Sequence, residues 1–238
     1  MNKVYLIPVK RACNANCTFC ISKDYANSKV SEIMDINNPE TLLNLKESLN
    51  FIKEKFKIDT IEVTGGGEPF LNKNLQDIID IVRSQLDDIW VKLYTNGFIH
   101  KNIKSVNELN ISRSHWDSEK NNIIYKSKFQ NDLGDTIKFF RPIVEELRLC
   151  TIKINGIMDN SNDYLKMVKM YEDLVDKFVL RPLIPEKKNI EKLFVDFSFE
   201  HPKVKHDEIE CHCHKNLVIG TDGLIYEDFN FNEKFIIS

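Results

Sequence analysis

Apolar residues along the chain switch repeatedly between short continuous runs and the three-and-four spacing of an amphipathic helix. The short runs predict six β-strands, at residues 4–8, 60–64, 90–95, 109–112, 147–154 and 178–182. Helical spacing is clearest over residues 39–56, and it recurs over 75–86 and 165–175. Strands that alternate with helices are typical of parallel βα units joined by right-handed crossovers. We therefore predict an α/β fold with the form of a partial, open (β/α)6 barrel.

The alternation stops near residue 185. Residues 1–185 are therefore predicted to form the barrel, and residues 186–238 a short C-terminal extension. Mixed spacing at 188–199 indicates a weaker helix, and two apolar runs around an Asp-Gly turn at 217–226 predict a hairpin. We expect this extension to cover the open side of the barrel as a lid.

Composition and charge narrow the function classes. The chain has 238 residues, of which 42% are hydrophobic, and a formal net charge of −3, so it lacks the basic field that nucleic-acid binding usually requires. No apolar stretch approaches the ~20 residues of a membrane span, and the run at 4–8 is too short for a signal-peptide core. We expect a cytoplasmic protein without a nucleic-acid or membrane partner.

Three cysteines, Cys13, Cys17 and Cys20, follow the first predicted strand with the spacing Cys-x3-Cys-x2-Cys. Clustered cysteines in a reducing compartment are more often metal ligands than disulfide partners. Three thiolates can hold three corners of a cubane iron–sulfur cluster and leave the fourth iron open, whereas a closed electron-transfer site needs four. A zinc site completed by a histidine, or three structural cysteines in a loop, is the alternative.

A glycine-rich motif, Gly65-Gly66-Gly67-Glu68, follows the strand predicted at 60–64. Consecutive glycines let the backbone approach a ligand closely, because no Cβ atom intervenes. The carboxylate that follows can accept hydrogen bonds from an ammonium group. Taken alone, the motif is also compatible with an ordinary strand-to-helix turn.

Together, the two motifs resemble the radical S-adenosylmethionine (SAM) superfamily. The resemblance implies a radical-SAM-type barrel in which Cys13, Cys17 and Cys20 hold a [4Fe-4S] cluster. It also implies that SAM chelates the open iron through its amino and carboxylate groups. Phe19 matches the position that packs near the adenine, and residues 65–68 match the motif that binds the methionine part of SAM.

Polar residues also end the later strands, where ligands bind in open α/β sheets. Thr95 and Asn96 end the third strand, Ser112 and Arg113 the fourth, and Arg181 the sixth. The resemblance makes these five residues candidates for binding SAM, since similar elements of family members lie beside SAM or the substrate. Simpler explanations are a tight turn, a connecting loop and, for the last arginine, a salt bridge in the barrel wall.

A few further residues could reach the substrate or hold a metal. His115 and Lys153 would suit a substrate with phosphate or carboxylate groups, and Asn155 lies near the same strand end. An auxiliary metal site could draw on Cys150, Cys211 and Cys213. However, these are fewer cysteines than the auxiliary clusters of the family use, so the question stays open.

The resemblance implies an oxygen-sensitive enzyme. An external electron donor reduces the cluster, SAM is cleaved to methionine and a 5′-deoxyadenosyl radical, and the radical abstracts hydrogen from the substrate. We expect a small-molecule substrate, such as a nucleotide or another metabolite with phosphate or carboxylate groups, because the chain begins at its first strand and leaves no domain to capture a leader peptide. The alternatives are peptide or protein modification, including activation of a glycyl-radical enzyme, and a non-catalytic metal-binding regulator.

Overall fold

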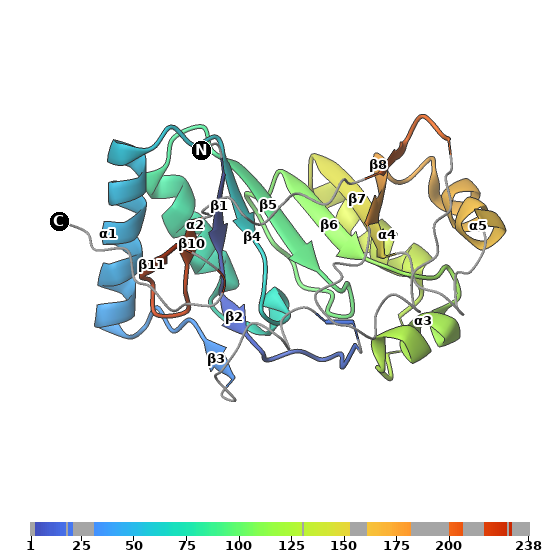
Figure 1. Ribbon diagram of the computed structural model, residues 1–238, viewed down its shortest axis with the longest axis horizontal. Coiled ribbons are helices and arrows are strands. Elements are labelled where there is room, and N and C mark those ends of the chain that lie inside the picture. Colours follow the sequence, from blue (N-terminus) through green and yellow to red (C-terminus); the bar gives the residue numbers. More distant parts are fainter. Residues whose placement is uncertain are drawn as a thin grey trace.

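The computed structural model describes residues 3–17, 19–20, 31–129, 131–152, 161–181, 200–206, 217–227 and 229. Nine strands of this part form one sheet in the order β11-β10-β1-β4-β5-β6-β7-β8-β9 (Figure 1). Their bounds are β1 Lys3–Leu6, β4 Thr60–Val63, β5 Trp90–Thr95, β6 Glu108–Ser112, β7 Glu146–Ile152, β8 Lys177–Arg181, β9 Val204–His206, β10 Val218–Ile219 and β11 Ile225–Tyr226. A separate ribbon pairs β2 Val9–Lys10 with β3 Glu32–Ile33.

All six predicted strands are present, and they pair in parallel from β1 to β8 in chain order. The α/β class with a parallel sheet is therefore confirmed. The first predicted run is divided, since β1 ends at Leu6 and the chain then leaves the sheet to form β2. The last two residues of the strand predicted at 147–154, and Pro182, lie outside the described residues.

The helices are α1 Pro39–Lys55, α2 Leu75–Gln85, α3 Ser118–Tyr125, α4 Leu133–Phe140 and α5 Ser161–Tyr171, with short 3-10 turns η2 Pro69–Leu71 and η3 Arg141–Ile143. The three predicted helices correspond to α1, α2 and α5. Asn38 caps α1 by accepting a hydrogen bond from the Glu40 amide. Apolar faces of α1, α2, α4 and α5 pack against one face of the sheet and form the main core. Among the described helices, none combines the length and apolar character that crossing a bilayer requires.

The other face of the sheet is polar and charged. Side chains alternate between the two faces of a strand, so residues in register with Glu62 share the face turned away from the helices. The Glu62 carboxylate lies 3.7 Å from the ammonium groups of both Lys3 and Lys92. On the neighbouring strands, the Arg148 guanidinium lies 2.9 Å from the Glu108 carboxylate. The sheet therefore has one apolar face, which packs on the helices, and one polar face, which carries paired charges.

The C-terminal hairpin extends the sheet beyond β1. β10 pairs in parallel with β1, and β11 pairs antiparallel with β10. The Ser48 hydroxyl of α1 donates a 2.8 Å hydrogen bond to the Gly223 carbonyl in the turn between them. The predicted hairpin is thus confirmed. Its pairing with the edge of β1 was not predicted from the sequence. The boundary at residue 185 and the lid remain predictions, and the helix predicted at 188–199 lies outside the described residues.

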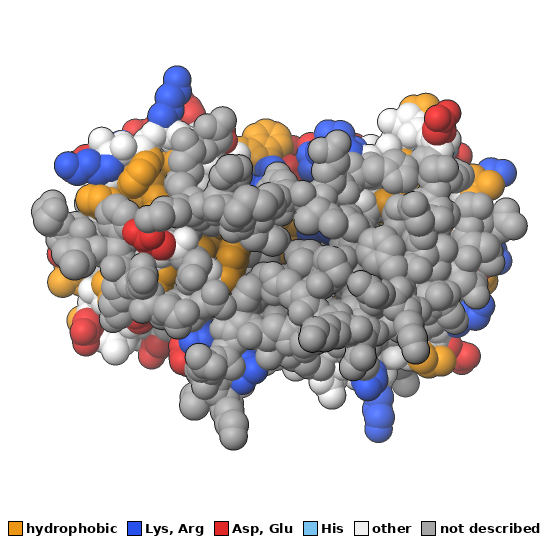
Figure 2. All heavy atoms as spheres, viewed as in Figure 1, with side chains coloured by type: hydrophobic (Ala, Val, Ile, Leu, Met, Phe, Trp, Pro, Cys, Tyr) orange, Lys and Arg blue, Asp and Glu red, His pale blue; other side chains and the backbone are white. Residues whose placement is uncertain are grey.

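Charged side chains of both signs lie around the margin of one face of the molecule (Figure 2). Figure 2 shows basic and acidic side chains interspersed around the margin of this face, as far as the described residues reveal it. This distribution agrees with the formal net charge of −3.

Candidate functional site

The cysteine segment follows β2 and lies beside the carboxyl ends of β4 and β5. Cys13 is exposed, Cys17 and Cys20 are partly exposed, and none of the three forms a disulfide within the described part of the chain. Over those residues, no three Cys, His, Asp or Glu side chains are grouped closely enough to hold a single metal ion. The single-zinc alternative is not tested by this finding. A cubane cluster is larger than one ion, so its three thiolate ligands stand further apart.

The glycine motif runs directly alongside the residues that precede the first cysteine. The Arg11 amide donates a 2.8 Å hydrogen bond to the Gly66 carbonyl, and the Glu68 amide donates one of 2.8 Å to the Ala12 carbonyl. A Cβ atom at Gly67 would lie 2.1 Å from the Ala12 oxygen. Glycine is therefore required here by the contact between two chain segments. The same contact fixes the position of the cysteine segment.

Glu68 connects the ends of two strands. Its side chain is only 2% exposed, and its carboxylate accepts hydrogen bonds from the Thr95 hydroxyl at 2.7 Å, the Asn96 amide at 2.8 Å and the Phe70 amide at 3.1 Å. Burial raises the pKa of Glu68 to about 7, although these hydrogen bonds act in the opposite direction. The carboxylate thus holds the turn after β5 against the glycine motif. Its contact with an ammonium group of SAM remains a prediction.

The Thr95-Asn96-Gly97 turn reaches the cysteine segment. The Asn96 side-chain amide donates to the Asn14 side-chain oxygen at 2.6 Å and lies 3.8 Å from the Cys13 sulfur. Gly97 has a φ of +74°, as a tight turn requires. The element is therefore both a tight turn and a direct neighbour of the first cysteine. Four predicted site residues, Glu68, Thr95, Asn96 and Cys13, are brought together.

Helix α3 packs against the other side of the cysteine segment. The Asn16 amide donates a 2.9 Å hydrogen bond to the Tyr125 carbonyl, and the Phe19 ring centroid lies 5.8 Å from that of Tyr125. Cys17 packs against the same apolar cluster. Sequence reasoning missed Tyr125. The sequence did contain a signal for α3, the helix that carries Tyr125. That signal was Asp117, which caps α3 by accepting a hydrogen bond from the Lys120 amide. The predicted place of Phe19 beside the adenine is not tested by this contact.

Ser112 ends β6 and Arg113 follows it, and the two residues differ in exposure. Ser112 is partly exposed and in register with Cys150 of β7. Arg113 is only 3% exposed, and its guanidinium donates to the His115 carbonyl at 3.0 Å and the Ser118 hydroxyl at 2.9 Å. Burial lowers the pKa of Arg113. These contacts show that Arg113 holds the loop after β6. The SAM-binding role of both residues remains a prediction.

Arg181 lies on the polar face at the end of β8. Its guanidinium carbon is 5.0 Å from the centroid of the Tyr94 ring, and a guanidinium N–H group donates a 3.4 Å hydrogen bond to the Tyr94 hydroxyl. Tyr94 belongs to β5, so β6 and β7 lie between the two residues in the sheet. Neighbouring strands are about 4.8 Å apart, and a flat sheet would keep these side chains well separated. The sheet therefore curves around its polar face.

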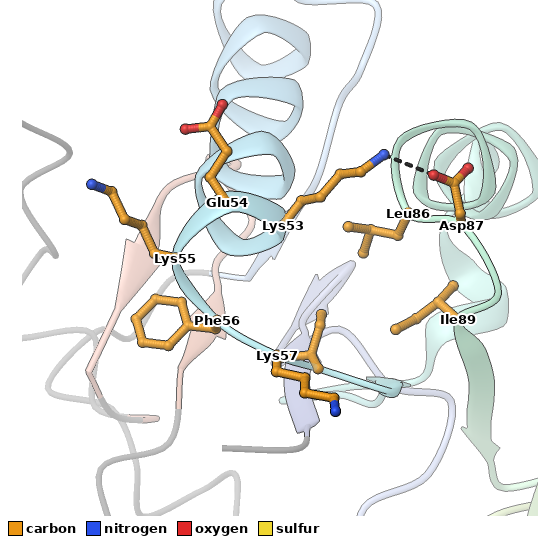
Figure 3. Close-up of a pocket in the computed structure, with 9 residues that line it drawn as sticks. Lys53, Glu54, Lys55, Phe56, Lys57, Leu86, Asp87 and Ile89 are labelled. Atoms are coloured by element: carbon orange, nitrogen blue, oxygen red, sulfur yellow. Dashed lines mark hydrogen bonds and ion pairs between the residues drawn. The ribbon is translucent and has the colours of Figure 1, made fainter.

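A surface pocket lies away from this site. It is lined by the C-terminal end of α1 and the turn after α2, and the Lys53 ammonium forms a 2.9 Å ion pair with Asp87 across it (Figure 3). Both chain segments lead into the amino ends of β4 and β5, whereas the cysteine segment lies at their carboxyl ends. The pocket is therefore unrelated to the candidate site. The predicted residues Lys153, Asn155, Cys211 and Cys213 lie outside the described part of the chain.

Comparisons with known proteins agree with these motifs. The family model described as "Radical SAM superfamily" matches residues 7–169. A UPF0026 protein of Helicobacter pylori is 24% identical over 217 residues, which cover 87% of this chain and 66% of that protein. A GTP 3',8-cyclase of Campylobacter jejuni is 30% identical over 167 residues, which cover 66% of this chain. This chain spans only 48% of the cyclase.

A solved structure has the same fold. The structure of Streptococcus suis SuiB bound to the precursor peptide SuiA matches with a TM-score of 0.67 at 12% identity, over 96% of this chain and 60% of SuiB. Members of the family bind a [4Fe-4S] cluster and SAM. The three thiols lie on one segment, which suits a cluster held by three cysteines. The glycine motif lies beside that segment and has no room for a Cβ atom at Gly67. Both features fit that pair of cofactors. The chain is an enzyme and belongs to the radical SAM superfamily.

Proposed function

We propose that this radical SAM enzyme acts on a small molecule that carries phosphate or carboxylate groups, with a nucleotide as the first candidate. Cys13, Cys17 and Cys20 would hold the cluster, and the bound cluster and SAM supply the radical chemistry. The residues of the glycine motif and the turn after β5 would position SAM. An external electron donor and a cytoplasmic location are parts of the same proposal.

The polar face of the curved sheet is the observation that carries this proposal. On the central strands, the wall carries Lys92 and Arg148, whose charges are paired with Glu62 and Glu108. Nearer the carboxyl ends it carries Arg181, which lies over the Tyr94 ring. An arginine guanidinium binds phosphate or carboxylate through two parallel hydrogen bonds. A wall of this kind suits a charged metabolite better than an apolar side chain of a peptide.

The cyclase relatives support a nucleotide within this class, since they are named for GTP and match 66% of this chain. The likeness to SuiB supports the fold alone at 12% identity. Peptide or protein modification, including activation of a glycyl-radical enzyme, is therefore the outcome that the experiment must separate from a small-molecule substrate.

The test is anaerobic reconstitution of the cluster, followed by incubation with SAM and a strong reductant. Formation of 5′-deoxyadenosine should accelerate on addition of a nucleotide such as GTP, or of a phosphorylated or carboxylated metabolite. Acceleration by a leader-bearing peptide alone would reject the substrate class. No 5′-deoxyadenosine from protein with a full cluster would reject SAM cleavage by this chain. Replacement of Cys17 by Ala is the control and should abolish the absorbance of the cluster.

A further inference from the structure

The segment from His115 to Asn121, which joins β6 to α3, contains an unusual group of buried nitrogen atoms. The His115 and Asn121 side chains are fully buried, and Trp116 is partly buried. Over the described residues, three of their atoms have no hydrogen-bond partner: His115 Nε2, Trp116 Nε1 and Asn121 Nδ2. A buried donor left unpaired costs about 1–3 kcal/mol, and native proteins contain few of them. Three in one segment therefore require an explanation.

All three unpaired atoms are donors. The Asp117 amide donates a 2.9 Å hydrogen bond to His115 Nδ1, so the proton of the neutral imidazole is on Nε2. Burial lowers the pKa of His115 and favours this neutral form. The Asn121 side-chain oxygen accepts from the Ser114 and His115 amides at 3.1 and 3.3 Å, which leaves its NH2 group unpaired. The indole N–H of Trp116 can only donate.

The surrounding charge is also suited to an acceptor. The Lys166 ammonium of α5 lies 3.5 Å from the centroid of the Trp116 ring. The Arg113 guanidinium is bonded to two neutral oxygens, so its charge is not neutralised there by a carboxylate. Asp117 and Asp163 act on His115, and Asp132 and Asp117 act on Arg113. Of these acids, Asp117 is occupied as the cap of α3, and Asp132 as the cap of α4. Donors beside two cations favour a ligand group that only accepts hydrogen bonds, which an oxyanion does.

The segment is linked to the cysteine segment through α3. The Ser114 hydroxyl lies 3.4 Å from the Tyr125 hydroxyl, within hydrogen-bond distance. The Tyr125 carbonyl in turn accepts the hydrogen bond from the Asn16 amide. An anion bound by His115, Trp116 and Asn121 would therefore lie on the wall that packs against the cofactor loop, at the carboxyl end of β6.

We propose that His115, Trp116 and Asn121 form a subsite for a phosphate or carboxylate group of the substrate. This inference rests on the proposed function, because it names the part of the enzyme that recognises the charged end of the small molecule. Phosphate and carboxylate share the required chemistry, and so does the carboxylate of SAM. The experiment must therefore separate these sources.

The test measures binding of inorganic phosphate, pyrophosphate and acetate to the reconstituted enzyme without SAM, by calorimetry. Trp116→Phe removes one donor and keeps an aromatic ring, and Asn121→Asp replaces a donor with an acceptor while keeping the oxygen that its amide partners need. Each variant should weaken binding of the best of these anions at least tenfold. Trp90→Phe is the matched control, since Trp90 begins β5 and so lies at the amino ends of the strands, whereas the segment follows the carboxyl end of β6, and it should bind as the wild type does.

Equal anion binding by the wild type and both variants would overturn the subsite, as would no binding of any of the three anions by the wild type. Competitive displacement of the anion by SAM would assign the site to the SAM carboxylate and also overturn it. These outcomes are independent of turnover. Stimulation of SAM cleavage by nucleotides with unchanged anion binding in the variants would reject the subsite and leave the proposed function intact. If the variants lose anion binding but no small molecule stimulates SAM cleavage, the subsite is supported and the proposed function is rejected.

Discussion

Glu68 is the residue at which stability and site geometry are most closely connected. Burial raises the pKa of its carboxyl to about 7, from 4.5. Between these pH values the folded protein keeps a proton that the unfolded chain has lost, so the free energy of unfolding falls as pH rises. We expect a contribution of about 3 kcal/mol, complete below pH ~4.5 and lost by pH ~7. Urea unfolding of the iron-free protein across this range measures it.

The control for this pH effect is Glu68→Gln, which removes the titrating group. The variant should be less stable at low pH by about 1–3 kcal/mol, because the NH2 group of glutamine cannot accept any of the hydrogen bonds made to Glu68, whereas both oxygens of the protonated carboxyl group can. Its free energy of unfolding should change less with pH than that of the wild type. Parallel pH curves for the two proteins would contradict the assignment of the titration to Glu68.

Two neighbouring glycines allow a sharper test at the residue scale. A Cβ atom at Gly67 would lie 2.1 Å from the Ala12 oxygen, whereas one at Gly66 would lie 3.3 Å from the nearest atom, Lys10 Cα. Gly67→Ala should therefore displace the cysteine segment and strongly reduce iron bound after reconstitution, while Gly66→Ala should retain most of it. Iron and sulfide analysis checks this. Equal iron content in the two variants would show that the close contact at Gly67 does not position the cysteines.

The sequence identified these motif residues but could not predict their partners. Close packing of Gly67 on Ala12 joins segments far apart in the chain, and no local pattern records it. For the same reason, the sequence did not predict that Glu68 accepts hydrogen bonds from Thr95, Asn96 and Phe70, and its contact with an ammonium group stays a prediction. Spacing shows which residue types occur near a strand end. The hydrogen bonds that each one makes depend on the tertiary fold.

At the scale of elements, the strands and the longer helices follow from the apolar pattern, but α3 and α4 do not. The first five residues of α3, Ser118–Asn122, are polar or charged, and Ile123, which follows, is 70% exposed. Its helical period is therefore weak. In α4 the period is present at Leu133, Ile137 and Phe140, but the helix has only 8 residues and includes Gly134. Tertiary packing decides such short elements more than propensity does.

Helix α3 supports the cysteine segment, and Tyr125 is the contact that can be tested. Tyr125→Phe keeps the ring against Phe19 and Phe98 and removes only the hydroxyl, whereas Tyr125→Ala removes the ring. We expect Tyr125→Ala to lose about 3–5 kcal/mol of stability and most of the bound iron, since a buried aromatic ring is deleted. Tyr125→Phe should retain the iron, as should Ile123→Ala on the exposed side of α3. Full iron binding by folded Tyr125→Ala would show that α3 does not hold the segment.

At the scale of the whole molecule, the C-terminal hairpin is part of the sheet. β10 has 2 residues, too few to show an alternating pattern, so the sequence could predict the hairpin but not its pairing with β1. The hairpin covers the edge of β1 and packs on α1. Residues near the two ends of the chain are thereby joined in one sheet, although more than 200 residues separate β1 from β10.

This arrangement predicts coupling between Ser48 and Gly223. Gly223 has a φ of +80°, and its Cβ atom would lie 2.7 Å from the Leu45 nitrogen and the Thr41 oxygen of α1. Gly223→Ala should therefore separate the hairpin from α1. Ser48→Ala should cost about 1 kcal/mol in the wild type, because it removes the hydrogen bond to the Gly223 carbonyl, and close to nothing in the Gly223→Ala background. Urea unfolding of the two single variants and the double variant measures the coupling. Strictly additive costs would mean that the hairpin does not depend on α1 for its position at the edge of β1.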